Sequence, residues 1–166
     1  MIFYTLKICL LSCVFIYLGE ITHGQVEAKV RFIDSVVTAI DSMKSTSRAI
    51  SEGTIRPKYK TLFKKVFKKR AKGHFADWFV ADSMKLHLLK VFSEIALSAT
   101  DYTTYYFLND TLIYVKLERL SPLQKGAYYF ENGLLIYTSG QPVGKPAGVL
   151  ANAGKYVANF KQFYDF

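Results

Sequence analysis

Apolar residues near the two ends of the chain recur at the three- and four-residue spacing of amphipathic helices. After Gln25 this spacing continues toward Gly53, and it predicts a helix over residues 26–51 that covers a core; a partner-binding or coiled-coil helix is the alternative. A second such pattern, beginning at the end of the Gly/Pro-rich segment 141–148, predicts a helix over residues 147–163. The apolar positions that define the two helices are Val26, Val30, Ile33, Val37, Ile40 and Met43, and Val149, Ala153, Tyr156, Val157, Phe160 and Phe163.

Between these two segments the pattern is typical of short strands joined by turns. In residues 111–119, apolar and polar residues alternate, as in a strand with one face in contact with water. Asn132 and Gly133 separate two apolar runs and predict a type I′ hairpin turn. Six strands are predicted, over residues 74–80, 85–97, 102–108, 111–119, 127–131 and 134–138.

These elements predict an α+β fold. We expect an antiparallel meander sheet of about six strands, covered by the long N-terminal helix and the C-terminal helix. The length of 166 residues fits one domain, which we place over residues 25–166. A content of 51% hydrophobic residues excludes a chain that stays disordered.

Two of the predicted hairpins are similar to each other. Residues 105–114 and 128–137 share Tyr-Tyr-Phe, an Asn two positions later, and a Leu-Ile-Tyr ending. The pattern Tyr-Tyr-Phe-x-Asn-Gly-x-Leu-Ile resembles hairpins in small exported bacterial proteins of uncharacterised function, over about residues 74–139. The resemblance implies an envelope protein with a meander sheet, and it carries no catalytic residues.

The first 24 residues are typical of a secretory signal peptide. Lys7 precedes an apolar run over residues 8–18, which is about half as long as a membrane-spanning helix needs. Small residues at positions 22 and 24 predict cleavage before Gln25 and export to the periplasm or the medium. An uncleaved N-terminal anchor is one alternative, and lipoprotein anchoring at Cys13 is another. Both cysteines, Cys9 and Cys13, lie in this segment, so the mature chain would have no thiol for disulfides, catalysis or metal ligation.

The formal net charge of +9 comes from one strip, residues 56–72. Outside this strip and the first 24 residues, basic and acidic residues are equal in number. Apolar residues interleave with the charges at helical spacing, which indicates a basic amphipathic helix that contacts an anionic membrane surface or a polyanion. A lysine-protected edge strand, or a merely solvated face, is the structural alternative. The positive residues are Arg56, Lys58, Lys60, Lys64, Lys65, Lys68, Lys69, Arg70 and Lys72.

Few residues suggest catalysis. The mature chain has two histidines, His74 and His87, at no metal-binding spacing, and it has no phosphate loop, nucleophile elbow or calcium loop. Asp77 and Glu94 would be an acid–base pair only if the fold brought them together, and His87 would need a nearby serine. We therefore expect no enzymatic activity, no cofactor and no metal; a hydrolase with an unrecognised site is the lesser alternative.

Aromatic residues are the remaining candidates for function. In the predicted sheet, Phe107 and Phe130 point to the face opposite Tyr106 and Tyr129, so these tyrosines should lie away from a core that contains the phenylalanines. Exposed tyrosines bind sugars, peptides or protein surfaces, although they are also good strand formers. The candidate ligand- or partner-binding residues are Trp78, Tyr106, Tyr114, Tyr129 and Tyr137.

The leading hypothesis is therefore an exported, non-enzymatic binding protein. It would hold an envelope protein, a peptide or a glycan on its aromatic sheet face. The alternative is a peripheral binder of anionic membranes or polyanions that acts through residues 56–72, and nucleic acid is not an expected partner. The two hypotheses differ in salt dependence, because counterion-driven association weakens with salt and an aromatic interface persists.

Overall fold

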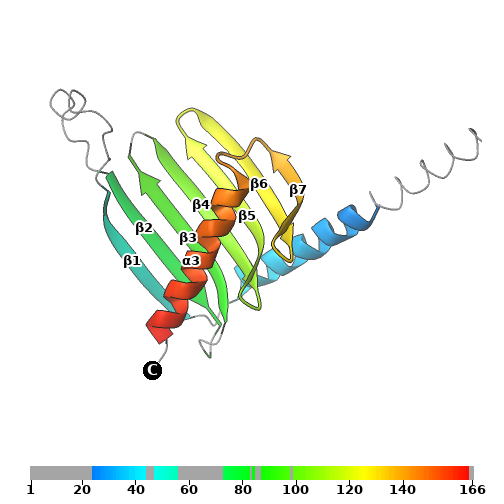
Figure 1. The fold of residues 1–166 in the computed structure, drawn as a ribbon, viewed down its shortest axis with the longest axis horizontal. Helices are drawn as coiled ribbons and strands as arrows, with labels where there is room; N and C mark the ends of the chain where they lie inside the picture. Colours follow the sequence, from blue (N-terminus) through cyan, green and yellow to red (C-terminus); the bar gives the residue numbers. More distant parts are fainter. Residues whose placement is uncertain are drawn as a thin grey trace, which may run out of the picture.

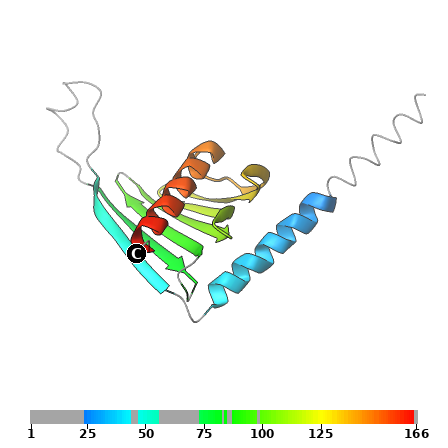
Figure 2. The same ribbon diagram turned by 60° about the horizontal axis from the view of Figure 1, so that its bottom comes forward.

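A single antiparallel sheet of seven strands forms the centre of the molecule, and a helix lies on each of its faces (Figure 1). The computed structural model describes residues 24–43, 47–55, 73–82, 84, 87–97 and 99–164. The strands pair in chain order, β1 to β7, as a meander. The N-terminal helix, described over residues 24–42, and α3 lie on opposite sides of the sheet (Figure 2). The predicted α+β class, with a meander sheet and two covering helices, is confirmed.

The strands are seven to ten residues long. They are β1 (Ser47–Ile55), β2 (Gly73–Ala81), β3 (Leu88–Ala96), β4 (Thr100–Leu108), β5 (Thr111–Leu120), β6 (Leu123–Glu131) and β7 (Leu134–Gly140). The chain ends with α3 (Pro146–Tyr164), which matches the helix predicted over residues 147–163. Pro146 suits the first turn of α3, where its missing N–H has no helical partner.

The larger hydrophobic core lies between the sheet and α3. Alternate residues of the strands point to this face, so the period of two in the strands meets the helical period of α3. Phe79, Phe107 and Phe130 are each 1% exposed, and they pack with Val149 and Phe160 of α3. This core fixes which face of every strand is turned toward α3.

A smaller core lies on the opposite face, beneath the N-terminal helix. Ile33 and Ile40 of the helix pack with Tyr106, Ile113 and Tyr129 of the sheet. Other apolar residues of the helix remain outside this core; Phe32 is 58% exposed. The N-terminal helix therefore buries a narrow stripe, and it covers the sheet less completely than α3 does.

One element differs from the sequence prediction. The helix predicted over residues 26–51 ends by residue 42, and residues 47–51 belong to β1. Ser47–Ile55 has a weak strand pattern of its own, but it pairs residue for residue with β2, from Ser47 opposite Ala81 to Ile55 opposite Gly73. The open edge of β2 provides hydrogen-bond partners for this segment, and this tertiary pairing overrides its local preference.

Both duplicated hairpins close with a tight two-residue turn. Asn132 and Gly133 have φ angles of 51° and 78°, and Asn109 and Asp110 have φ angles of 51° and 59°. Positive φ at both central residues defines the type I′ turn, so the prediction for Asn132-Gly133 is confirmed.

Candidate functional site

The face of the sheet turned away from α3 carries all five aromatic residues predicted from the sequence. Four of them lie in one row across four neighbouring strands, in the order Tyr106, Tyr114, Tyr129 and Tyr137. Successive ring centroids are 5.6, 4.8 and 5.4 Å apart. We call these four residues the tyrosine row.

A repeated irregularity in the two hairpins produces the tyrosine row. Tyr106 pairs with Tyr114 while Phe107 pairs with Leu112, so Ile113 is an extra residue in β5. Ile136 is the extra residue of β7 in the same way, between Leu135 and Tyr137. Such a β-bulge breaks the strict alternation of faces, so the Ile and the Tyr of each Leu-Ile-Tyr sequence both turn toward the N-terminal helix. The duplicated sequence therefore encodes a bulge as well as a turn.

The N-terminal helix covers most of the tyrosine row and binds it through two carboxylates. The Tyr106 hydroxyl donates a hydrogen bond to Oδ2 of Asp41 at 3.0 Å, and the Tyr129 hydroxyl donates one to Oδ1 of Asp34 at 3.0 Å. Nζ of Lys90 forms an ion pair with Asp41 at 2.6 Å. Asp34 and Asp41 are seven residues apart, which places both on one side of the helix.

These contacts give the tyrosine row a structural role. Tyr106 and Tyr129 are 5% and 8% exposed, whereas Tyr137 at the sheet edge is 45% exposed. Burial, followed by the charge of Asp41, raises the pKa of the Tyr106 hydroxyl above its ordinary range, and burial and the hydrogen bond to Asp34 raise the pKa of Tyr129. The orientation of Tyr106 and Tyr129 opposite the phenylalanines is confirmed, but the expectation that they are exposed is wrong, because a helix covers them.

Beside the tyrosine row, a second group of aromatic residues lies outside both cores. Trp78, Phe92 and Tyr102 come from β2, β3 and β4 and are partly buried. The ring centroids of Trp78 and Phe92 are 5.2 Å apart, and those of Phe92 and Tyr102 are 5.8 Å apart with the two rings inclined by 21°. We call these three residues the aromatic shelf. Of these three residues, only Trp78 was among the binding residues predicted from the sequence.

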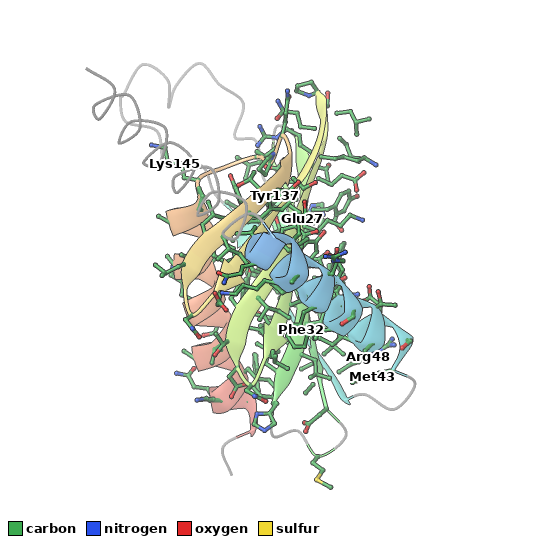
Figure 3. The ribbon with its side chains drawn as sticks, turned by 90° about the vertical axis from the view of Figure 1, so that its right-hand side faces the viewer. Glu27, Phe32, Met43, Arg48, Tyr137 and Lys145 are labelled. Atoms are coloured by element: carbon green, nitrogen blue, oxygen red, sulfur yellow. The ribbon has the colours of Figure 1, made fainter. Side chains whose placement is uncertain are left out.

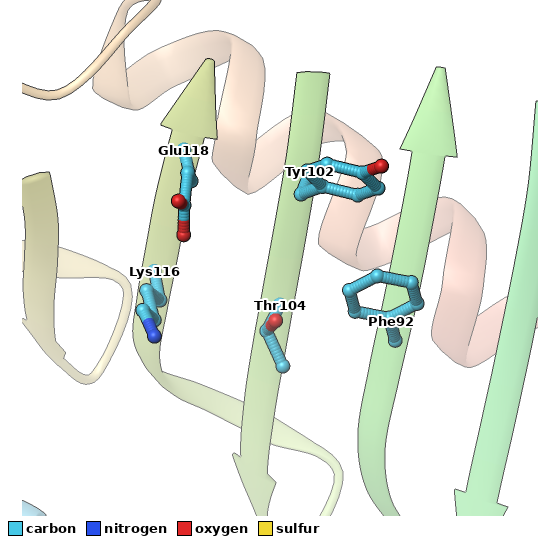
Figure 4. Close-up of a pocket in the computed structure, with 5 residues that line it drawn as sticks. All are labelled: Phe92, Tyr102, Thr104, Lys116 and Glu118. Carbon is cyan, nitrogen blue, oxygen red and sulfur yellow. The ribbon is translucent and has the colours of Figure 1, made fainter. Parts of the chain in front are cut away.

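The aromatic shelf forms one wall of a shallow pocket of about 280 Å³ (Figure 4). Phe92 and Tyr102 line it together with three polar residues, Thr104, Lys116 and Glu118. The register explains this grouping, because Phe92, Thr104 and Lys116 lie side by side in one row, and Tyr102 and Glu118 are paired in the next. The alternation of Tyr114, Lys116 and Glu118 indicated the polar half of this pocket in the sequence, but the strand register was needed to place it beside the shelf.

The pocket contains fixed charge of both signs. Glu118 forms an ion pair with Lys125 at 2.8 Å, and this hydrogen bond, with the nearby charges of Lys125 and Lys116, lowers the pKa of the Glu118 carboxyl. Glu118 is therefore ionised at neutral pH and accepts hydrogen bonds, while Lys116 donates them. Thr104, which is 9% exposed, provides a hydroxyl that both donates and accepts.

Asp77 and Glu94, the acid–base pair weighed for catalysis, are not brought together because they lie on opposite faces of the sheet. Asp77 accepts a hydrogen bond from Tyr156 of α3, whereas Glu94 pairs with Tyr102 in the row on the opposite face. Nε2 of His74 lies 3.4 Å from Oε1 of Glu94, and Nδ1 of His87 lies 3.8 Å from Oδ2 of Asp110. The side chains of both histidines are exposed. Within the described residues, no group of three potential metal ligands is present.

Two predicted segments lie outside the described residues. They are the signal peptide, of which residues 1–23 are not described, and the basic strip, residues 56–72. Among the helices that the structure describes, none is long and apolar enough to cross a membrane.

Comparison with other proteins adds no relative. The chain matches no protein-family model, no curated protein and no solved structure. The class of protein is therefore defined by its architecture, an α+β domain in which a seven-stranded antiparallel meander is held between two helices and an aromatic pocket remains open on one face.

Proposed function

We propose that this protein is an exported, non-enzymatic binding protein that holds a glycan on its aromatic shelf. The observation that carries the proposal is the row of rings from Trp78 to Tyr102 on a rigid sheet, with hydrogen-bonding groups of both kinds beside it. Export rests on the leader pattern of residues 1–24.

The chemistry of the pocket favours a ligand with a flat apolar face and polar edges. Aromatic rings bury a large area at small entropic cost, and they pack against flat apolar surfaces. Thr104, Lys116 and Glu118 stand next to the rings and provide a hydroxyl, an ammonium and a carboxylate. A sugar ring has this combination, because its C–H face is apolar and its hydroxyl groups project from the rim.

The size of the pocket limits the ligand to a small unit. Its volume of about 280 Å³ is near the lower end of the range of small-molecule sites. One or two sugar rings therefore fit the pocket, and a longer glycan would continue along the open sheet toward Trp78 and Ile50, which is 60% exposed and paired with Trp78.

Trp78 provides a direct test, because it is the only tryptophan of the chain. Its fluorescence reports on the shelf without a label. We expect that titration with chitotriose, a β-linked oligosaccharide, changes the emission of Trp78, and that the oligosaccharide is recovered uncleaved. Tyr102→Ala should weaken binding about tenfold, the equivalent of one aromatic contact. Tyr137→Ala is the matched control, since it removes a tyrosine from the same face outside the shelf.

Other outcomes of this titration would contradict the proposed function. If chitotriose leaves the emission of Trp78 unchanged, or if Tyr102→Ala binds as tightly as the original chain, the glycan site is refuted. If chitotriose is cleaved, the non-enzymatic assignment is wrong. If chitotriose does not bind but the original chain is retained on anionic vesicles at low salt and released at high salt, electrostatic contact through residues 56–72 replaces the shelf as the explanation.

A further inference from the structure

The outer edge of β7 is an open sheet edge without the usual protection against strand pairing. β7 is the last strand in the sheet order, so no described residue pairs with its outer side. Its seven residues contain neither a charged residue nor a proline, which are common devices that block pairing at an edge. Leu134, Leu135 and Tyr137 are 71%, 44% and 45% exposed. The opposite edge strand, β1, carries Arg48 and Glu52.

The N-terminal helix adds a side-chain groove beside this edge. Viewed from the β7 side, Tyr137 lies next to the N-terminal part of the helix, near Glu27 (Figure 3). The groove encloses about 280 Å³ and is lined by Val26, Glu27, Val30, Arg31 and Tyr137. An eighth strand added to β7 would therefore continue the sheet and place one of its faces against Val26 and Val30.

The backbone register shows which groups the edge offers. The N–H of Gln141 donates to the carbonyl of Lys125, and hydrogen-bonded and non-hydrogen-bonded pairs alternate along an antiparallel ladder. In the same register the backbone N–H and C=O of Tyr137 point toward β6. The backbone N–H and C=O of Thr138 therefore point to the open edge. Thr138 thus presents a donor and an acceptor to an incoming strand.

We propose that β7 and this groove bind an extended, uncharged segment of a partner protein by strand addition. Backbone hydrogen bonds to the edge and alternate apolar side chains in the groove are the two components of such recognition. An uncharged centre of the segment matches β7, because none of the seven residues of this strand carries a charge that could pair with one on the segment.

A second copy of the chain fits the edge less well. Antiparallel pairing of two β7 strands across a two-fold axis would place both N-terminal helices on the same face of the joined sheet. Val26 and Val30 line the groove at Tyr137, and the N-terminal helix extends past β7 beyond the edge of the sheet (Figure 1), so the helices of both copies would lie across the joint on that one face. A single extended segment meets no such obstacle.

The test is fluorescence anisotropy with the full-length chain and a labelled synthetic peptide. The probe alternates valine and threonine over about eight residues, a typical strand length. We expect the original chain to bind this peptide and not a version with lysine at its centre. Thr138→Pro removes the outward N–H while sparing the bonds to β6, and it should weaken binding about tenfold or more. Thr138→Val, which keeps the N–H, is the control and should bind like the original chain.

A second variant, Tyr137→Lys, tests the proposal if Thr138→Pro does not fold. Tyr137→Lys places a charge in the groove at an exposed position and should also abolish peptide binding. The proposal is overturned if the alternating peptide does not bind, or if its binding survives Tyr137→Lys. It is also overturned if light scattering finds a dimer that this substitution dissociates, since the edge would then join two copies. Chitotriose binding at the shelf should be unaffected by Tyr137→Lys, so the two proposals can fail separately.

Discussion

Substitution of Gly133 tests the hairpin between β6 and β7, on which the position of Tyr137 depends. Gly133 has a φ of 78°, in the left-handed region, and a Cβ built on it meets nothing within 4 Å. A Cβ here therefore meets no other part of the molecule, and the cost of a side chain comes from the backbone conformation at Gly133. For a β-branched residue the left-handed conformation costs about 1–2 kcal/mol, offset in part by the lower entropy of the unfolded chain. We expect Gly133→Val to destabilise the fold by about 1 kcal/mol.

The chain contains its own reference for this substitution. The first hairpin has Asp110 at the corresponding position, with a φ of 59°. Asp tolerates the left-handed conformation, so Gly133→Asp should lower the free energy of unfolding by only roughly a few tenths of a kcal/mol. The comparison of the two variants separates the effect of φ from the effect of adding any side chain.

Urea unfolding and thermal unfolding, followed by circular dichroism, measure the difference. For a chain of this size about 1 kcal/mol corresponds to a shift of roughly 2–4 °C in the thermal midpoint. An unchanged midpoint for Gly133→Val would refute the argument from φ. Equal losses for the Val and Asp variants would also refute it, because the cost would then not depend on the left-handed conformation.

Three other predictions concern pH, charge and processing. Folding raises the pKa of Tyr129, so the stability that its neutral hydroxyl contributes is complete below the ordinary tyrosine pKa of about 10 and is lost as the pH rises toward the pKa in the folded state. Tyr129→Phe should therefore reduce the fall of the thermal midpoint at alkaline pH. An unaltered dependence of the midpoint on pH would contradict this prediction. Four lysines of the basic strip, replaced by Gln, should leave the unfolding midpoint nearly unchanged but abolish retention on anionic vesicles; an original chain that is not retained at low salt would disprove the electrostatic alternative. The replaced residues are Lys64, Lys65, Lys68 and Lys69. Intact mass of the protein from the envelope should show Gln25 as the first residue, whereas a lipid on Cys13 would show anchoring instead.

The local pattern of the sequence determined most of the elements. The period of two in β5, the Asn-Gly turn and the helical period before Phe163 each depend on residues close together in the chain. Such signals are sufficient for the β4–β5 and β6–β7 hairpins, because a two-residue turn leaves the two strands it joins no partner except each other. The separation of Phe107 and Phe130 from the neighbouring tyrosines followed from the same alternation.

Tertiary structure alone decided β1, the bulges and the pocket. Ser47–Ile55 becomes a strand because the edge of β2 is free to pair with it, and nothing within the segment requires that conformation. The extra residues Ile113 and Ile136 show in the sequence as a repeated Leu-Ile-Tyr, but the repeat alone does not say that Ile and Tyr share a face.

The N-terminal helix shows most clearly why the site could not be predicted from the sequence. Its apolar spacing predicted that it covers part of the sheet, but not which part. Asp34 and Asp41 select the tyrosine row by hydrogen bonding to Tyr129 and Tyr106, and this choice leaves Trp78 and its neighbours uncovered. Contacts between residues 65 and 95 positions apart in the chain depend on how the helix docks, and no local pattern encodes that docking.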